Sequence, residues 1–250
     1  MPEGKWKTRY LLFLVLVSFS TLCLIAVITF LSPHVSPDGF AYRRQITGLM
    51  FSALCILGII AVFFPQHCAR SPHEERLINK RSDTYLHGEH DLQKSSWIGG
   101  VTVTHGHHPL CDPYRQHEFI FGKKTLCSAC MGLFCGALIS LAGAWYVFFQ
   151  RFTYELPYGI VFTLGAVLIA FGLAPYVVAN PLGPVRRFSF NALMIVGMLL
   201  ALVGVDGRAQ SLALNAFLIG FFVFVIFTRI SLSQDKHEQI CATCGQTCTT

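Results

Sequence analysis

Long, unbroken apolar runs constrain the fold of this chain more than any other feature of its sequence. There are six runs of roughly 20 residues, and each can cross a hydrocarbon core of about 30 Å as an α-helix. A backbone inside a bilayer must satisfy its own hydrogen bonds, so a helix is the expected structure of each run. The sequence therefore predicts an all-α, polytopic transmembrane bundle of about six helices. The runs span residues 10–31, 46–65, 126–149, 158–179, 190–205 and 212–231.

The composition argues against an ordinary soluble domain. Of the 250 residues, 53% are hydrophobic and 13% are charged, and this charged share is about half that of a typical soluble protein. The first run follows Lys5, Lys7 and Arg9, as in a secretory signal peptide. It is longer than the apolar core of about 7 to 15 residues found in such peptides. We therefore expect a retained first membrane helix, with the lipid bilayer as the main partner of the chain.

Turn-forming residues separate the runs and divide the chain. Ser32-Pro33, the proline and glycine residues of 180–184 and the Asp206-Gly207 pair all favour chain reversal over helix continuation. We expect two membrane helices, a polar loop, four more membrane helices and a cysteine-rich tail. These parts occupy residues 1–65, 66–125, 126–231 and 232–250.

Lysine and arginine residues are distributed unequally between the two sides of the predicted membrane. Six spans place both termini, the 66–125 loop and the loop that begins at Asn180 on one side. With Arg229 at the end of the sixth span counted there, this side holds 15 of the 19 basic residues. Basic residues resist translocation and accumulate in the cytoplasm. We therefore expect a cell-membrane protein with both termini cytoplasmic. This asymmetry explains the net charge of +6, and the scattered cations give no indication of nucleic-acid binding.

Eight of the ten cysteines fall on the predicted cytoplasmic side or in the cytoplasmic half of the third span. Thiols stay reduced in the cytoplasm, so a dense cysteine pattern there favours metal binding or thiol chemistry over disulfides. Cys23 and Cys55 lie inside the first two spans, where we expect them to be buried as small hydrophobic residues.

The 66–125 loop ends in a dense cluster of histidine and cysteine. Cys127 and Cys130 have the Cys-x2-Cys spacing that lets two thiolates hold one ion. Mixed thiolate and imidazole ligands in a reducing compartment favour zinc. Residues 101–104 and 118–121 alternate as strands do, and Gly122-Lys123 can turn one strand into the next, so we expect a small knuckle closed by the metal. The candidate ligands are His105, His107, His108, Cys111, His117, Cys127 and Cys130.

More than one ligand set fits this cluster. A tetrahedral set can contain the three cysteines Cys111, Cys127 and Cys130, and its fourth ligand can be His107, His108 or His117. Four protein ligands would make the site structural, whereas three would leave a position for water and permit catalysis. A second dense pattern lies in the tail, on the same predicted membrane face, where it can complete the loop site or form another. Its candidate ligands are His237, Cys241, Cys244 and Cys248.

The run from His107 to Gly132 resembles a family of uncharacterised prokaryotic multi-pass membrane proteins classed as a domain of unknown function. It contains His-His-Pro-x-Cys, a spaced His117, a glycine turn, and Cys-x2-Cys followed by Met-Gly as a helix begins. The cysteine-rich tail is similar to that of some members. The resemblance implies a polytopic helical fold and a Cys/His site, and it implies no activity.

Small residues recur every four positions in the third and fourth spans, which favours close helix packing. We therefore expect these two helices in the middle of the bundle. The spans contain no Asp, Glu, Lys or Arg away from their ends, which counts against ion-coupled transport. Asn191 and Asn215 are expected to form interhelical hydrogen bonds. The small residues are Gly132, Gly136, Ser140 and Ala144, then Ala166, Ala170 and Ala174.

Three functions fit these features. The leading hypothesis is a non-catalytic protein whose zinc knuckle docks a partner or stabilises a membrane complex. The second is a membrane thiol oxidoreductase or metalloenzyme, because a helix start lowers the pKa of thiols such as Cys127 and Cys130, and Glu118 is a candidate general base. The third is a transporter of a neutral or lipophilic solute.

Overall fold

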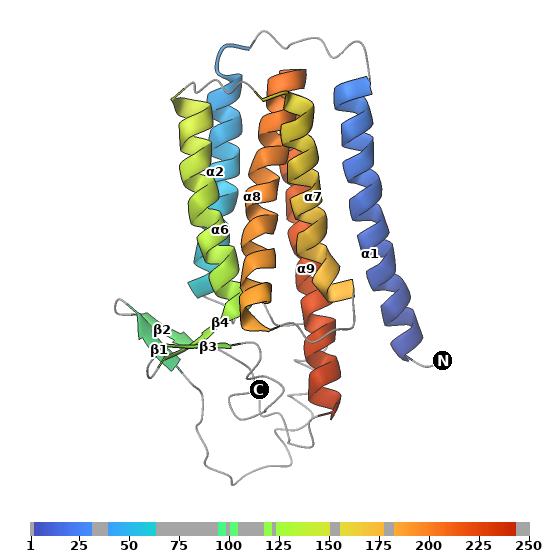
Figure 1. The fold of residues 1–250 in the computed structure, drawn as a ribbon, viewed down its shortest axis with the longest axis vertical. Coiled ribbons are helices and arrows are strands. Elements are labelled where there is room, and N and C mark those ends of the chain that lie inside the picture. The colour runs from blue at the N-terminus through green and yellow to red at the C-terminus, as the bar shows by residue number, and fades with distance from the viewer. Residues whose placement is uncertain are drawn as a thin grey trace, which may run out of the picture.

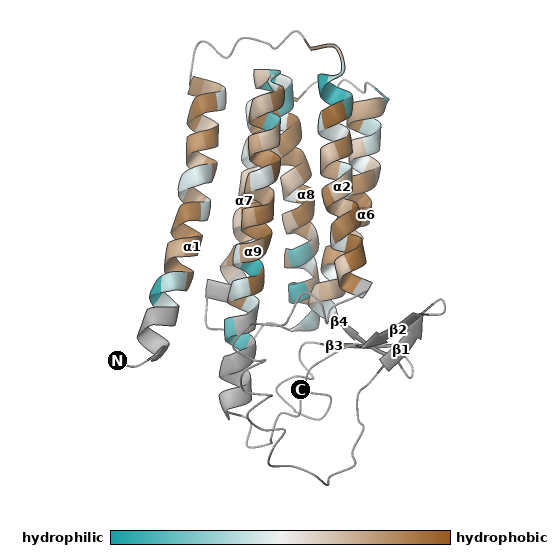
Figure 2. Cartoon of the chain, turned by 180° about the vertical axis from the view of Figure 1, so that it is seen from behind, coloured by the Kyte–Doolittle hydropathy of each residue, from teal (hydrophilic) through white to brown (hydrophobic). Residues whose placement is uncertain are grey.

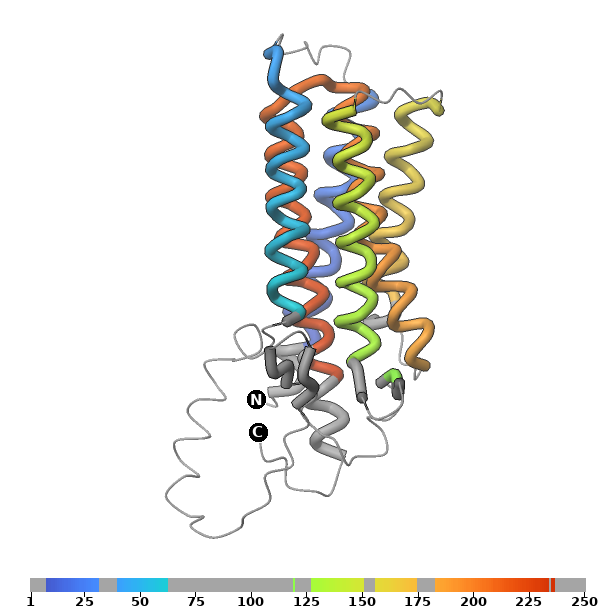
Figure 3. Tube along the Cα trace, turned by 90° about the vertical axis from the view of Figure 1, so that its left-hand side faces the viewer, coloured from blue at the N-terminus to red at the C-terminus, as the bar shows by residue number. Residues whose placement is uncertain are grey.

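A computed structural model of the chain confirms an all-α bundle. Six long helices are present among the described residues, and they run along one common axis (Figures 1 and 3). Two of them end in a π-helical turn, labelled η. The helices are α1 Glu3–Ala26 with η1 Val27–Leu31, α2 Arg43–Phe63, α6 Ser128–Ala144 with η2 Trp145–Phe149, α7 Tyr158–Val177, α8 Pro184–Ala209 and α9 Leu212–Thr243. The structure describes residues 3–31, 40–63, 95–98, 101–104, 118–121, 124–150, 156–177 and 183–243.

Five of these helices are long and apolar enough to cross a membrane, which makes the chain an integral membrane protein. Hydrophobic residues dominate the central stretch of the bundle, and hydrophilic residues gather toward its ends (Figure 2). The apolar part of α7, Tyr158–Ala174, is shorter than the other five. The five spans are Thr8–Leu31, Arg43–Val62, Ser128–Phe149, Pro184–Ala209 and Leu212–Ser233.

The predicted break at Asp206-Gly207 is wrong. Helix α8 starts at Pro184, with proline in its first turn, and continues through both residues to Ala209. It ends at Gln210, whose backbone is left-handed with φ of 50°. Asp206 does not turn the chain because its carboxylate has partners on neighbouring helices. The predicted fifth span, 190–205, was therefore too short at both ends.

Helix α8 lies between α6 and α7 (Figure 1) and is the most buried of the five spans. This corrects the expectation that the third and fourth spans occupy the middle. The small face of α6 is buried as predicted, and it packs on α8: a Cβ added at Gly136 would lie 2.7 Å from the Ala192 carbonyl oxygen. On α7 the close approach is at Gly165, where a Cβ would lie 2.6 Å from the Gly197 carbonyl oxygen. Backbones this close require glycine.

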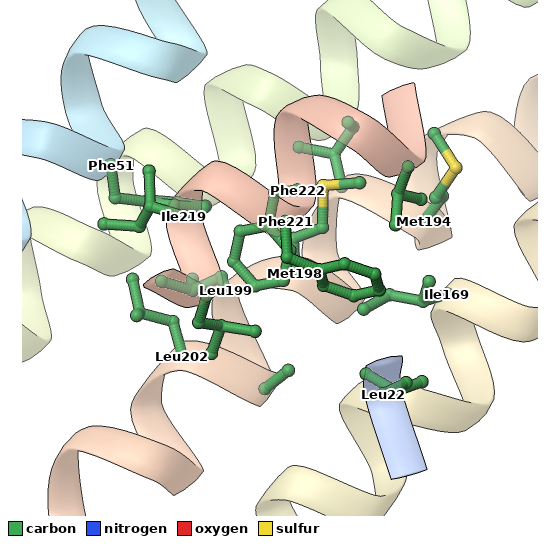
Figure 4. Packing of buried hydrophobic residues seen from close by; sticks show 14 of the residues in the cluster. Leu22, Phe51, Ile169, Met194, Met198, Leu199, Leu202, Ile219, Phe221 and Phe222 are labelled. Carbon is green, nitrogen blue, oxygen red and sulfur yellow. The ribbon is translucent and has the colours of Figure 1, made fainter. Parts of the chain in front are cut away.

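Large apolar side chains fill the space between α8, α9, α2 and α7 (Figure 4). Phe51 of α2 meets Phe222 of α9 edge to face, with ring centroids 6.3 Å apart. Met194 and Met198 of α8 are fully buried beside Ile169 of α7. This core holds α8 at the centre of the bundle.

Two short antiparallel hairpins lie at one end of the bundle, together with the start of α1 and the end of α9 (Figure 1). We call this the hairpin end. Strands were predicted at 101–104 and 118–121, and both are confirmed; the predicted turn at Gly122-Lys123 lies outside the described residues. The hairpins pair β1 Ser95–Ile98 with β2 Val101–Thr104, and β3 Glu118–Phe121 with β4 Lys124–Cys127. Helix α9 continues past residue 231 to Thr243, so the predicted tail begins as part of that helix.

Candidate thiol site at the start of α6

Cys127 and Cys130 lie where β4 becomes α6. Cys127 is the last residue of β4 and the N-cap of α6, with an extended backbone (φ −65°, ψ 119°), and Cys130 follows in the first helical turn. One turn of helix brings residues three apart to the same side, so the Cys-x2-Cys spacing places the two thiols together. Both residues are half-buried. Cys127 therefore lies just before the Ser128–Phe149 span, and Cys130 lies in its first turn.

The surroundings of Cys127 favour its thiolate form. The pKa of Cys127 is lowered to about 6, and the largest cause is a hydrogen bond from the Cys130 thiol. Burial acts in the opposite direction and raises the pKa. The backbone N–H groups of Cys130 and Ala129 and the charge of Arg229 lower it further. The Cys127 side chain makes no conventional capping hydrogen bond. Free N–H groups at a helix start carry partial positive charge.

Arg229 of α9 is a part of this site that sequence reasoning counted only as a cytoplasmic-side cation. Only 7% of Arg229 is exposed, and its Nε donates to Asn191 Oδ1 of α8 at 2.8 Å. The Asn191 amide is itself fixed by donating to the Arg187 carbonyl oxygen at 2.6 Å. This bond confirms the interhelical role expected for Asn191. The sequence did contain a signal for this role. Arg229 lies inside the last apolar run, four residues before its end at Ser233, and a charged side chain at such a position can turn into the bundle.

The hairpin β3–β4 is fixed to the bundle beside the thiols. Its register pairs Glu118 with Cys127, so the start of β3 lies next to the start of α6. Phe119 of β3 meets Phe188 of α8 edge to face, with ring centroids 6.0 Å apart. Ser128, directly after Cys127, is fully buried. Elements β3, β4, α6, α8 and α9 thus converge on one corner of the hairpin end.

The structure tests only part of the predicted ligand cluster. It brings Cys127 and Cys130 together, and among the residues it describes it forms no group of three or more His, Cys, Asp or Glu. His237 and Cys241 lie on α9, but their side chains are outside the description. The other predicted ligands lie wholly outside the described residues; they are His105, His107, His108, Cys111, His117, Cys244 and Cys248.

The remaining described cysteines stand apart from this pair. Cys55 of α2 is buried, as expected, whereas Cys23 lies on the exposed face of α1 and the expectation that it is buried is wrong. Cys135 is half-buried further along α6. Cys23 fits that position because a cysteine is apolar enough to face lipid.

No protein-family model, curated protein or solved structure matches this chain.

Proposed function

We propose that this multi-pass membrane protein holds a structural zinc ion at Cys127 and Cys130 and serves as a scaffold or assembly component of a membrane complex. The observation that supports the proposal is the thiol pair itself. Two sulfur atoms that share a hydrogen bond at a helix start can both turn toward one ion, and the lowered pKa of Cys127 supplies a thiolate ligand at neutral pH. Zinc accepts such sulfur ligands at about 2.3 Å.

The other ligands come from the segment before β3. His117 is joined directly to Glu118, which pairs with Cys127 across the hairpin. Consecutive Cα atoms are about 3.8 Å apart, so His117 has the shortest connection to the thiol pair of the histidines in that segment. Cys111 is the third sulfur ligand, and His107 or His108 is the alternative to His117. Cys241 and the cysteines after it complete the same site or build another, because α9 ends at the hairpin end.

Zinc content per chain tests this proposal. Detergent-purified wild-type protein is compared with the Cys127→Ser/Cys130→Ser variant by elemental analysis, and Cys135→Ser is the control because it removes a thiol from the same helix outside the pair. We expect about one zinc ion in wild type and in the control, and loss of zinc in the double variant. Equal zinc in all three proteins, or no zinc in wild type, would refute the site.

A thiol oxidoreductase is the second candidate, and the hydrogen bond between the two thiols favours it. In that role the Cys127 thiolate attacks a substrate disulfide, Cys130 then displaces the substrate, and the pair becomes a disulfide while the substrate gains two thiols. This function requires a metal-free pair. Zinc-free wild-type protein that reduces a small disulfide stoichiometrically, with no turnover by the double variant, would favour the oxidoreductase over the scaffold.

A further inference from the structure

A second polar cluster lies inside the bundle at the end opposite the hairpins, which we call the Asp206 end. Asp206 of α8 is 4% exposed, and its carboxylate accepts hydrogen bonds from Arg43 of α2 and, at 2.6 Å, from Asn215 Nδ2 of α9. Asn215 Nδ2 also lies 3.0 Å from Thr47 Oγ1. Arg44 Nε lies 3.9 Å from Asp206 Oδ2. One carboxylate thus joins three helices and faces two arginines.

The cluster has more positive than negative charge. Asp206 and Asp235 are the only acidic residues whose side chains the structure describes, and Asp235 lies near the far end of α9. Two guanidinium groups therefore face one carboxylate. Both arginines also begin α2, where the helix dipole adds positive potential. The balance favours one further negative charge at this position.

Polar atoms at this cluster still lack partners among the described residues. They are one donor, Arg44 Nε, and one acceptor, Asn215 Oδ1, both buried. Asn215 is fully buried, and leaving such a group unpaired costs about 1–3 kcal/mol. The Arg44 guanidinium is thus not fully satisfied by the described residues, which favours an additional anionic acceptor.

The depth of the cluster places it at the lipid headgroups. The α2 span begins at Arg43 and the α8 span ends at Ala209. The Arg44 side chain is 33% exposed, and its Nη2 donates to the Val147 carbonyl oxygen of η2 at 3.0 Å. Trp145 and Tyr146, on the same turn, are more than half exposed. Exposed aromatic residues at a span end are typical of the membrane–water interface.

We propose that the cluster around Arg44 and Asp206 binds the phosphate of an anionic phospholipid. The exposed part of the Arg44 guanidinium holds the phosphate. The acyl chains lie along the apolar outer faces of α2 and η2. Arg43 remains paired with Asp206, so lipid binding leaves the buried ion pair intact.

Lipid binding to delipidated full-length protein tests this proposal by native mass spectrometry. Phosphatidylglycerol supplies an anionic phosphate, and phosphatidylcholine supplies a phosphate in a headgroup without net charge. The Arg44→Gln variant removes the proposed phosphate ligand. Arg208→Gln is the matched control, because Arg208 is an exposed arginine at the same end of the bundle. We expect wild type and the control to bind phosphatidylglycerol at least tenfold more tightly than phosphatidylcholine, and Arg44→Gln to lose roughly tenfold or more.

Three results would overturn the proposal. Equal binding by Arg44→Gln and wild type would remove the site, and equal binding of the two lipids would remove the requirement for a net negative charge. Competition by soluble glycerol phosphate as strong as that by phosphatidylglycerol would make the ligand a water-soluble phosphate ester and not a lipid. If Arg44→Gln does not fold, the comparison of the two lipids on wild-type protein decides the proposal, because it needs no variant.

Discussion

At the scale of single residues, two buried charges distinguish the ends of this bundle. Asp206 and Arg229 both lie near the ends of apolar helices, yet both are buried and bonded to residues of other helices. A charge inside a membrane bundle is costly unless it is paired, so each of these side chains marks a place where helices are held in one arrangement. The consequences of removing them differ.

Replacing Asp206 with asparagine leaves Arg43 buried without its carboxylate. Breaking a buried pair from one side costs about 3–5 kcal/mol, so we expect a clear fall in the thermal unfolding midpoint of the detergent-solubilised protein. Asp235→Asn removes a half-buried aspartate near the hairpin end and should cost about 0–1 kcal/mol. An unchanged midpoint for Asp206→Asn would mean that the pair does not hold α2 against α8.

The lowered pKa of Cys127 predicts a distinct pH dependence for its alkylation in metal-free protein. Only the thiolate reacts, so the rate at Cys127 should rise through pH of about 6 and level off above it. Cys130→Ala removes the hydrogen-bonding group that contributes most, and the midpoint should move up toward the ordinary thiol value of about 8.5. Modification is followed by peptide mass analysis. A midpoint that is the same in both proteins would contradict the role given to Cys130.

At the scale of elements, glycines set how closely the helices approach α8. A methyl group at position 136 would collide with the backbone of Ala192, whereas one at Gly220 of α9 would meet nothing within 4 Å. Gly136→Ala should therefore destabilise the bundle by about 1–3 kcal/mol through overpacking. Gly220→Ala should be neutral or stabilise it by up to about 1 kcal/mol, because alanine favours a helix. Thermal unfolding in detergent measures both, and a gain from Gly136→Ala would show that α6 and α8 are not in close contact.

At the scale of the whole molecule, the described ends of the chain lie together at the hairpin end (Figure 1). The lysine and arginine distribution predicts that this end is cytoplasmic. Two reporters test this orientation in bacterial cells, because the fluorescent protein works only in the cytoplasm and alkaline phosphatase works only outside it. A fluorescent protein fused after Thr250 should then fluoresce, and alkaline phosphatase inserted after Gln210 should be active. Exchanging the two reporters should silence both. The reverse pattern would mean that the bundle has the opposite orientation in the membrane and that the thiol site lies outside the cytoplasm.

The sequence alone determined the helices, two of the strands and the place of the thiol pair. A bilayer requires apolar runs of a fixed length, so runs such as 10–31 and 212–231 identify helices without any knowledge of their neighbours. Strand alternation at 118–121 and the glycine after it likewise depend only on local residues. All of the predicted metal ligands, in the loop, at the thiol pair and in the tail, stay predictions, as does the resemblance to a membrane protein family.

The tertiary structure decided which helix is central and which polar residues are buried. Asp206-Gly207 has the local chemistry of a turn, and only the arginine and asparagine of neighbouring helices explain why the helix continues through it. Arg229 looks like an ordinary cytoplasmic cation until Asn191 of α8 is placed beside it. Burial and pairing depend on which faces of separate helices meet, and residues far apart in the chain determine those contacts.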